Sequence, residues 1–338
     1  MAKSRYVAWA ILLSFCLLFG VSFFIHKLPD AAVKNKIAIT YSFSGGRFGD
    51  NLIAFSHAAW LAYTMDLGFV YKPFPYSDRL RMGIDPDLKR EEELKNYEER
   101  RLLSAEEYLN FLTEVSQGSR DQKILYNLMY FSESLHEYDH NGWLAQYIKV
   151  DWNDPGFKTF LQKMISPLTN VPQKPVDETR IQVALHVRKG GGFDPPLWEL
   201  SSVLKGPPET YYEKALAILA DLLKKPLYVF IFTDHQQPRE IQARFEQKFS
   251  GKDIVFNSDL TPQDVVEDFF ALGEFEYLIC PDSSYSKMAA YLFPYKGVLF
   301  PAHYNRSWNG TVRIDRIRIR LTPPFGPVKR PLEMELRN

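Results

Sequence analysis

Two cations followed by three glycines are the residues of this sequence whose chemistry is easiest to interpret. Arg188 and Lys189 directly precede Gly190, Gly191 and Gly192. Because glycine has no Cβ, the backbone N–H groups of such a loop can approach an anion closely, and the two cations add positive charge. The pattern predicts a cradle for a phosphate group. A tight turn with solvated charges is the alternative interpretation.

A second segment combines hydroxyl side chains with the expected start of a helix. Residues 281–286 read PDSSYS and precede an apolar helical pattern. The N-terminus of a helix is positively polarised and has unpaired N–H groups, so Ser283, Ser284 and Ser286 would favour a bound anion there. Simple N-capping of the helix would use the same side chains.

Two carboxylates stand at similar positions elsewhere in the chain. Asp234 follows an apolar run that ends at Thr233, and its carboxylate can accept the paired N–H donors of a guanine edge. Asp50 lies with Arg47 in a glycine-rich turn between an expected strand and an expected helix, which makes both candidates for chemistry. A helix-capping role for Asp50 is the alternative.

All four segments follow a predicted strand in a regular alternation of strands and helices. Strands are predicted at residues 36–41, Ile181–Val187, Leu227–Thr233, 253–256, 277–280 and 297–300. Helices are predicted at residues 51–66, 208–223, 239–249 and Ser284–Leu292, with a further helix opened by Thr261 and Pro262. This alternation predicts an α/β fold with a parallel sheet, in which ligands bind beyond the carboxyl ends of the strands.

The chain length predicts two domains with terminal segments on either side. With 338 residues, the chain is too long for one ordinary core. Residues 85–147 have a mostly helical pattern and are expected to form a helical insertion, and residues 167–175 are the expected linker. The predicted divisions are residues 1–35, 36–170, 171–322 and a proline-rich tail at 323–338.

Charge and cysteine content narrow the possible partners and locations. Lys plus Arg and Asp plus Glu are 41 each, so no basic excess points to nucleic acid. Cys16 and Cys280 are the only cysteines, and no disulfide within a domain is expected. Residues 6–25 carry no charge and are long enough to span a bilayer, which predicts a single-pass membrane anchor. A cleaved signal peptide is the alternative.

Taken together, the motifs resemble those of the fucosyltransferase superfamily. Residues 47–51 (RFGDN) resemble its GRFGN-type loop, and residues 186–190 (HVRKG) resemble its HxRxG motif. Residues 232–234 (FTD) resemble its TDD-type turn, and residues 283–290 (SSYSKMAA) resemble its SSFSxxAA segment. The order and spacing of the four segments also agree with that superfamily.

The resemblance implies a GT-B fold, in which two Rossmann-like domains face a cleft. The N-terminal domain would be the acceptor side, and the C-terminal domain would hold GDP-fucose without a metal or other cofactor. His186, Arg188 and Gly190 would form the donor-binding motif, with Arg188 on the β-phosphate. Asp234 would bind guanine, and Ser283, Ser284 and Ser286 would bind the phosphates.

The implied reaction is inverting transfer of fucose to a glycan hydroxyl, but the catalytic base is not defined by the resemblance. Many members carry Asp where this chain has Gly191, His235 replaces a second Asp, and Asp50 stands where Asn is frequent. Inverting transfer needs a group that deprotonates the acceptor hydroxyl. Asp50 and, as a second choice, Asp194 are the candidates, while Arg188 and Arg47 would offset the charge that develops on GDP.

Three further interpretations remain open from the sequence. Residues 136–140 (HEYDH) match the HExxH zinc motif of metalloproteases, although Asn141 and Gly142, which end helices, follow at once. Residues 85–87 (DPD) match a DxD metal motif, which helix capping explains better. A catalytically inactive protein that binds a nucleotide sugar or a glycan at a membrane is the third. The membrane itself, bacterial inner or Golgi, is left open.

Overall fold

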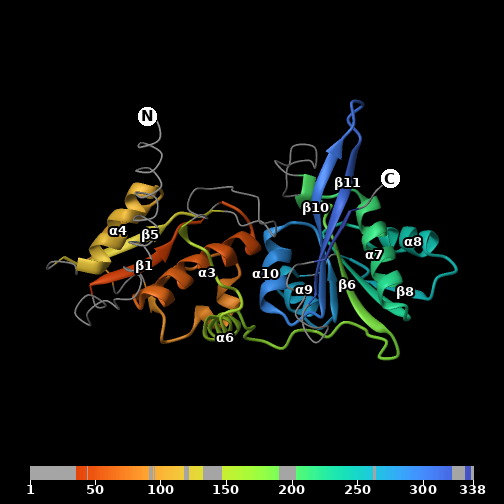
Figure 1. The fold of residues 1–338 in the computed structure, drawn as a ribbon. Coiled ribbons are helices and arrows are strands. Elements are labelled where there is room, and N and C mark those ends of the chain that lie inside the picture. Colours follow the sequence, from red (N-terminus) through yellow and green to blue (C-terminus); the bar gives the residue numbers. More distant parts are fainter. Residues whose placement is uncertain are drawn as a thin grey trace, which may run out of the picture.

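In the computed structural model, the described residues form two β-sheets that lie side by side, one parallel and one mixed, each with helices packed on it (Figure 1). The described residues are 36–43, 45–90, 94, 96–117, 122–131, 147–189, 203–261, 264–321 and 332–335. One sheet is built from residues before the predicted linker and the other from residues after it.

The first sheet is fully parallel, with the strand order β3-β2-β1-β5-β4. Its strands are β1 (Ile37–Tyr41), β2 (Gly68–Tyr71), β3 (Lys89–Arg90), β4 (Glu98–Leu102) and β5 (Ile124–Leu128). The helices of this unit are α3 (Phe48–Met65), α4 (Ala105–Gln117) and α6 (Pro155–Met164), with short 3-10 helices at Ser77–Arg79 and Arg81–Gly83. Both β1 and β5 are buried along their whole length, as is usual for central strands of a parallel sheet.

The second sheet has seven strands in the order β12-β11-β10-β9-β6-β7-β8. Five of them are parallel: β6 (Ile181–Val187), β7 (Leu227–Thr233), β8 (Ile254–Ser258), β9 (Tyr277–Ile279) and β10 (Gly297–Arg306). The other two, β11 (Val312–Leu321) and β12 (Leu332–Glu335), are added antiparallel. The helices are α7 (Glu209–Leu223), α8 (Pro238–Lys248), α9 (Val265–Leu272) and α10 (Ser284–Leu292), with a 3-10 helix at Val203–Lys205.

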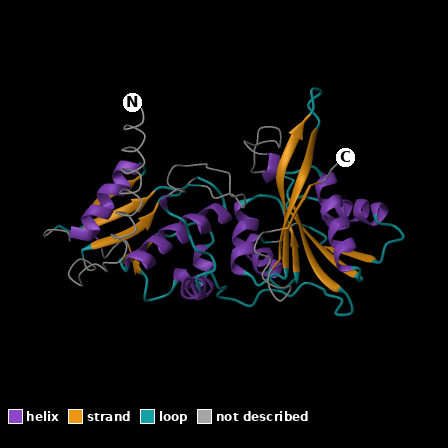
Figure 2. Ribbon diagram, viewed as in Figure 1, coloured by secondary structure: helices purple, strands orange, loops and turns teal. Residues whose placement is uncertain are grey.

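Helices α3 and α10 meet between the two sheets, as Figure 2 also shows. The contact is apolar: the Phe48 ring of α3 lies edge-on to Phe269 of α9, with 5.5 Å between ring centroids. One hydrophobic core therefore continues from the first sheet into α9 and α10. Burial of this size is the main stabilising term that holds the two units together.

Polar contacts near the start of α9 also hold the two units together. The Arg79 guanidinium of the first unit donates to Asp264, which caps α9, at 2.6 Å. Lys174, in the segment that joins the units, is nearly buried and pairs with Asp259 at 2.7 Å and with Asp268 at 3.0 Å. The acidic start of α9 thus receives one cation from the first unit and one from the linker.

The structure corrects three predictions about secondary structure. The described part of residues 85–147 is not mostly helical: β3, β4 and β5 lie there with a single described helix, α4. Charged residues fill β4 because it is an edge strand, in which only Leu102 is buried. Helix α9 begins at Val265 with Asp264 as its N-cap, three residues beyond the predicted N-cap, Thr261. Strand β10 is longer than predicted, and β11 was not predicted.

The predicted membrane anchor, residues 6–25, lies outside the described residues. Among the residues that the structure does describe, no helix is both long and apolar enough to cross a bilayer. The proline-rich segment 323–331 also lies outside them, whereas residues 332–335 of the predicted tail form β12.

Candidate functional site

The predicted site residues converge where the carboxyl ends of the second sheet meet the start of α3. His186 lies at the end of β6, Arg188 directly follows that strand, Asp234 follows β7, and Ser283 caps α10 after β9. Strands β6, β7 and β9 are parallel neighbours, so their carboxyl ends share one edge. Gly190, Gly191 and Asp194 lie outside the described residues.

The start of α10 is a compact network of hydroxyl groups against His186. The Ser283 hydroxyl accepts from the Ser286 backbone N–H at 3.3 Å, which confirms the N-cap interpretation. The Ser283 and Ser286 hydroxyls are 2.9 Å apart, and the Ser286 hydroxyl lies 2.7 Å from His186 Nδ1. The Ser283 and Ser286 hydroxyls are thus buried and bonded within this network, whereas Ser284 in the same turn is only partly buried. The terminus adds its own polarised N–H groups.

His186 is buried, and its charge state follows from its surroundings. Burial lowers the pKa of His186 to about 4, the carboxylate of Asp234 opposes this shift, and the nearby guanidinium groups of Arg188 and Arg47 add to it. The imidazole is therefore neutral at pH 7. Arg188 comes from the second sheet and Arg47 from the first unit, so two cations from different units act on one buried ring.

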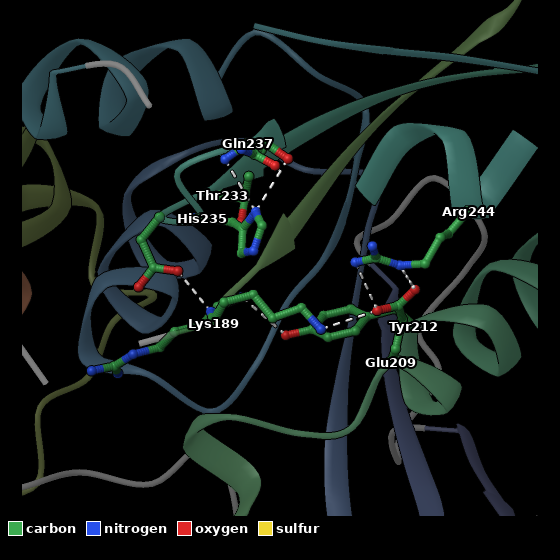
Figure 3. A network of polar contacts seen from close by, with 9 residues as sticks. Lys189, Glu209, Tyr212, Thr233, His235, Gln237 and Arg244 are labelled. Atoms are coloured by element: carbon green, nitrogen blue, oxygen red, sulfur yellow. Dashed lines mark hydrogen bonds and ion pairs between the residues drawn. The ribbon is translucent and has the colours of Figure 1, made fainter. Parts of the chain in front are cut away.

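The loop after β6 is held in place by its backbone (Figure 3). The Lys189 backbone N–H donates to Asp234 at 2.6 Å, and the Arg188 backbone N–H donates to the Tyr212 hydroxyl at 3.3 Å. These two bonds fix the direction in which the chain leaves β6, because they tie it to the end of β7 and to α7. The Asp234 carboxylate thus holds the loop in place and is also the candidate contact for the guanine base of a nucleotide.

The side chain of Lys189 extends toward Glu209 in Figure 3 and pairs with it at 3.0 Å. Glu209 also accepts from Arg244 at 2.9 Å. Burial alone would raise the pKa of Glu209, but the hydrogen bonds from Arg244 and Lys189 outweigh it and lower that pKa. His235 serves a local turn, since its Nδ1 accepts from the Gln237 backbone N–H at 3.1 Å.

Asp50 lies in the first turn of α3 and connects the two units. Its Oδ1 accepts from the Ser284 hydroxyl at 2.6 Å and from the Tyr130 hydroxyl at 2.9 Å. Its Oδ2 accepts from the Arg47 backbone N–H at 3.2 Å, which is a capping contact. The carboxylate therefore joins the ends of β5, α3 and α10, which lie far apart in the sequence.

Two glycines make this approach possible. A Cβ on Gly49 would lie 2.3 Å from the backbone N of Tyr285, so only glycine allows the first turn of α3 to lie against the first turn of α10. A Cβ on Gly46 would lie 2.2 Å from Oδ2 of Asp50. The Phe48 ring between them is buried against α9.

Sequence reasoning missed Tyr130, Tyr212 and Glu209. Tyr130 follows β5 by two residues, and the helical interpretation of residues 85–147 hid that strand. With β5 recognised, Tyr130 would have been placed at the carboxyl edge beside Asp50. No sequence pattern indicated Tyr212 or Glu209, because their contacts depend on how α7 packs on the sheet.

The structure gives no support to the metal motifs within its described part. No group of three or more His, Cys, Asp or Glu side chains there could hold a metal ion. Asp85 is buried, lies 3.0 Å from Lys163, and accepts from the Asp87 backbone N–H at 3.0 Å. A turn and β3 follow it, so it caps a turn and not the predicted helix. The HExxH segment, residues 136–140, lies outside the described residues.

Comparison with known proteins finds similarity in solved structures only. No protein-family model matches the chain, and no curated protein sequence matches it. A mutant of FUT1 from Arabidopsis thaliana in complex with GDP has a TM-score of 0.48 at 9% identity, over 78% of this chain and 70% of that one. The fucosyltransferase NodZ from Bradyrhizobium has a TM-score of 0.41 at 12% identity, over 85% of this chain and 99% of that one.

A third similar structure is POFUT1 in complex with GDP-fucose. Its TM-score is 0.40 at 11% identity, over 78% of this chain and 95% of that one. These similarities concern the arrangement of secondary structure.

Proposed function

We propose that this protein is an inverting glycosyltransferase that transfers fucose from GDP-fucose to a hydroxyl of a glycan. The observation that carries the proposal is the position of two arginines, one from each unit, beside the hydroxyl-rich start of α10. Arg188 directly follows β6 at the shared carboxyl edge, and Arg47 is the N-cap of α3, whose first turn lies against the first turn of α10. Two guanidinium groups and a helix N-terminus are suited to a diphosphate. The motif resemblance of residues 47–51, 186–190, 232–234 and 283–290 supplies the identity of the donor.

In this proposal the donor is held mainly by the second sheet. Arg188 binds the β-phosphate, and the start of α10 binds the phosphates through Ser283, Ser284 and Ser286. Asp234 accepts from the guanine edge, and His186 and Gly190 complete the loop around the diphosphate. Neutral His186 keeps Ser286 in place without adding a charge, since its ring is buried and its pKa is lowered to about 4.

The chemical step would take place at the start of α3. The acceptor oxygen attacks the anomeric carbon of fucose, the bond from that carbon to the diphosphate oxygen breaks, and GDP leaves with the electron pair. Asp50 takes the proton of the acceptor hydroxyl, and Arg188 and Arg47 offset the charge on the leaving diphosphate. Asp194 is the second choice for the base. The proposed reaction uses no metal and no other cofactor.

One observation favours a second function, that of an inactive protein that binds a nucleotide sugar or a glycan. Both oxygens of Asp50 already accept hydrogen bonds, from Ser284, Tyr130 and Arg47. Three of the roughly four lone-pair sites of the carboxylate are therefore in use, which leaves one on Oδ2 for the proton of an acceptor. In the enzyme, the Ser284 hydroxyl would turn to the donor phosphate when the donor binds and free Oδ1. In both functions, residues 6–25 would attach the protein to a membrane.

Nucleotide binding and turnover test the proposal. Calorimetric titration of the purified full-length protein with GDP, UDP and CMP should show tightest binding for GDP. Arg188→Ala should weaken GDP binding by roughly tenfold or more, because a charge-assisted hydrogen bond is worth about 1.5–3 kcal/mol. Release of GDP from GDP-fucose with a panel of galactosides then separates the enzyme from the inactive binder.

Arg180→Ala is the matched control for that variant. Arg180 directly precedes β6 and pairs with Asp177 and Asp253, whereas Arg188 directly follows the same strand. Both substitutions remove one guanidinium, but at opposite edges of the sheet. Equal GDP affinity of the Arg188→Ala variant and the unaltered protein would contradict the proposed site.

A further inference from the structure

The hairpin formed by β10 and β11 carries the most exposed large hydrophobic side chain among the described residues. Trp308 at its turn is 99% exposed, and Tyr304 on β10 is 37% exposed. All residues from 304 to 311 are exposed, whereas the strands are buried from Phe300 back into the sheet. A single exposed aromatic residue is ordinary on a protein surface, so its setting decides whether it has a role.

Beyond the sheet, β10 and β11 form a regularly paired two-stranded arm, residues 303–316. Beyond the buried part, the two strands continue their antiparallel pairing from His303 to the turn. Asp315 bridges the strands from β11, because it accepts from Asn305 at 2.6 Å and lies 2.7 Å from His303 Nδ1. Such cross-strand pairs hold an exposed hairpin in one register.

The turn itself is closed by its own hydrogen bonds. The Ser307 backbone N–H donates to the Thr311 carbonyl at 2.9 Å, and the Gly310 N–H donates to the Ser307 carbonyl at 2.9 Å. The side-chain oxygen of Asn309 accepts from the Thr311 N–H at 3.1 Å, and Gly310 has the positive φ of 83° that the turn requires. The indole of Trp308 is thus presented to solvent by a fixed backbone.

The arm starts at the edge of the sheet where the candidate donor site lies. Strand β10 is parallel to β9, and β9 is parallel to β6, so β10 leaves the sheet at the same carboxyl edge as the Arg188 loop and the start of α10. In Figure 1 the hairpin projects beyond the other strands of its sheet. At about 3.3 Å per residue, residues 304–308 carry the tip roughly 15 Å past the buried part.

The chemistry of the arm suits a saccharide. Flat aromatic faces pack against the C–H groups of sugar rings, and amide and guanidinium groups donate to hydroxyls. Tyr304 and Trp308 supply the faces, while Arg306, Asn309 and Arg313 supply donors, and no acidic residue lies between His303 and Arg313. Binding far from the reacting atoms is a common source of acceptor selectivity.

We propose that this hairpin is a remote subsite for the acceptor, and that the acceptor is an oligosaccharide chain long enough to reach from the donor site to Trp308. The proposal rests on the proposed function, because that function makes a glycan the second substrate. The hairpin starts at the same edge of the sheet as the candidate donor site. A contact with a lipid surface would not require that position, whereas a contact with the acceptor saccharide would.

Binding of oligosaccharides of graded length tests the arm. The full-length protein and its Trp308→Ala variant are applied to an immobilised panel of galactose-containing oligosaccharides from disaccharides upward. The unaltered protein should bind chains longer than a trisaccharide more tightly than the related disaccharides. Trp308→Ala should weaken that binding by about tenfold, which corresponds to about 1.4 kcal/mol, and should leave disaccharide binding and GDP affinity unchanged.

Leu222→Ala is the control, since it removes another exposed apolar side chain, near the C-terminus of α7. An equal preference for long chains in the Trp308→Ala variant would overturn the proposal, as would an unaltered protein that binds none of the oligosaccharides. Binding to phosphatidylglycerol vesicles that depends on Trp308 would overturn it in favour of a membrane contact. Failure of GDP binding, measured separately, would count against the proposed function and not against the arm.

Discussion

Helices α3 and α10 begin side by side, but their first turns carry opposite chemistry. The start of α10 is capped by the hydroxyl of Ser283, with Ser286 and neutral His186 behind it. The start of α3 already holds a carboxylate, because Asp50 accepts from the Arg47 backbone N–H and from two hydroxyls. An anion is stabilised at any helix N-terminus; at α3 the anion is the helix's own Asp50, whereas the cap of α10 is a hydroxyl.

This difference assigns separate tasks to the two termini. In the proposed function, a diphosphate binds at α10, and the group that accepts a proton stands at α3. The Ser284 hydroxyl connects them, since it stands on α10 and donates to Asp50. Substitutions on either side should therefore affect binding and turnover differently, and they give four ways to test the comparison.

The largest expected effect is on turnover in the Asp50→Asn variant. A general base contributes roughly 10²- to 10⁴-fold to a rate, so fucose transfer should fall by about 10³-fold. GDP affinity should change little, because the donor lies at α10. Initial rates of GDP release and calorimetric titration with GDP check the two parts. If the Asp50→Asn variant kept its turnover, Asp194 would become the candidate for the catalytic base. If the variant also lost GDP binding, the division of tasks between α3 and α10 would be wrong.

The second prediction concerns pH and the buried ring of His186. Its pKa is lowered to about 4 in the folded protein and is about 6.5 when unfolded, so the unfolded chain binds a proton first as the pH falls. Stability from this group is therefore present above pH 6.5 and is lost between pH 6.5 and 4, by up to about 3 kcal/mol. Urea unfolding at a series of pH values measures it.

The control for this prediction is the His186→Asn variant, whose free energy of unfolding should depend less on pH in the same range. Asp268 titrates in the opposite sense, because burial raises its pKa to about 6 and its contribution to stability falls as the pH rises from 4 to 6. The difference between the two proteins removes the contribution of Asp268. Identical pH profiles would show that the ring is solvated.

The C-terminal half of the fold was predictable because its strands are short apolar runs between clear turns. Ile181–Val187, Leu227–Thr233 and the helix Ser284–Leu292 have the predicted bounds, and the site loops follow them as expected. A strand in the middle of a parallel sheet is apolar on both faces, which makes its ends easy to find. The positions of Arg188, Asp234 and Ser283 followed from those ends.

The edges of both sheets were not predictable by the same reasoning. Strand β4 reads EERRL and β3 has two residues, so neither shows an apolar run. In β11, Ile314 and Ile317 are both buried although they lie three residues apart, so the two-residue alternation is interrupted between them. The interruption lies where the pairing register shifts opposite His303. A bulge of this kind breaks the alternation by which a half-buried strand is recognised. The contact of Asp50 with Ser284 depends on packing between units, which no local pattern encodes.

A smaller effect is expected from Gly49→Ala, which tests whether the two helix starts must touch. In the interior of a helix, alanine is usually more favourable than glycine by about 1 kcal/mol. Here the new Cβ would lie 2.3 Å from the Tyr285 backbone N, so the free energy of unfolding should instead fall by about 2 kcal/mol. Gly68→Ala is the control, since its Cβ would meet nothing closer than 3.4 Å. A stabilised Gly49→Ala variant would mean that the helices can separate.

The smallest effect is expected from Tyr130→Phe, which removes one of the two hydroxyls on Oδ1 of Asp50 and keeps the ring. Tyr130 is partly exposed and Ser284 still donates to the same oxygen, so the fold should keep its stability within about 0.5 kcal/mol. Turnover should fall by about tenfold, because the carboxylate loses a contact that fixes its direction, while the KM for GDP-fucose stays the same. Ser284→Ala separates the two donors: as a residue at the start of α10, it should raise the KM for GDP-fucose as well. If both variants changed only turnover, Ser284 would belong to the chemistry of α3, and the two helix starts would form one catalytic unit.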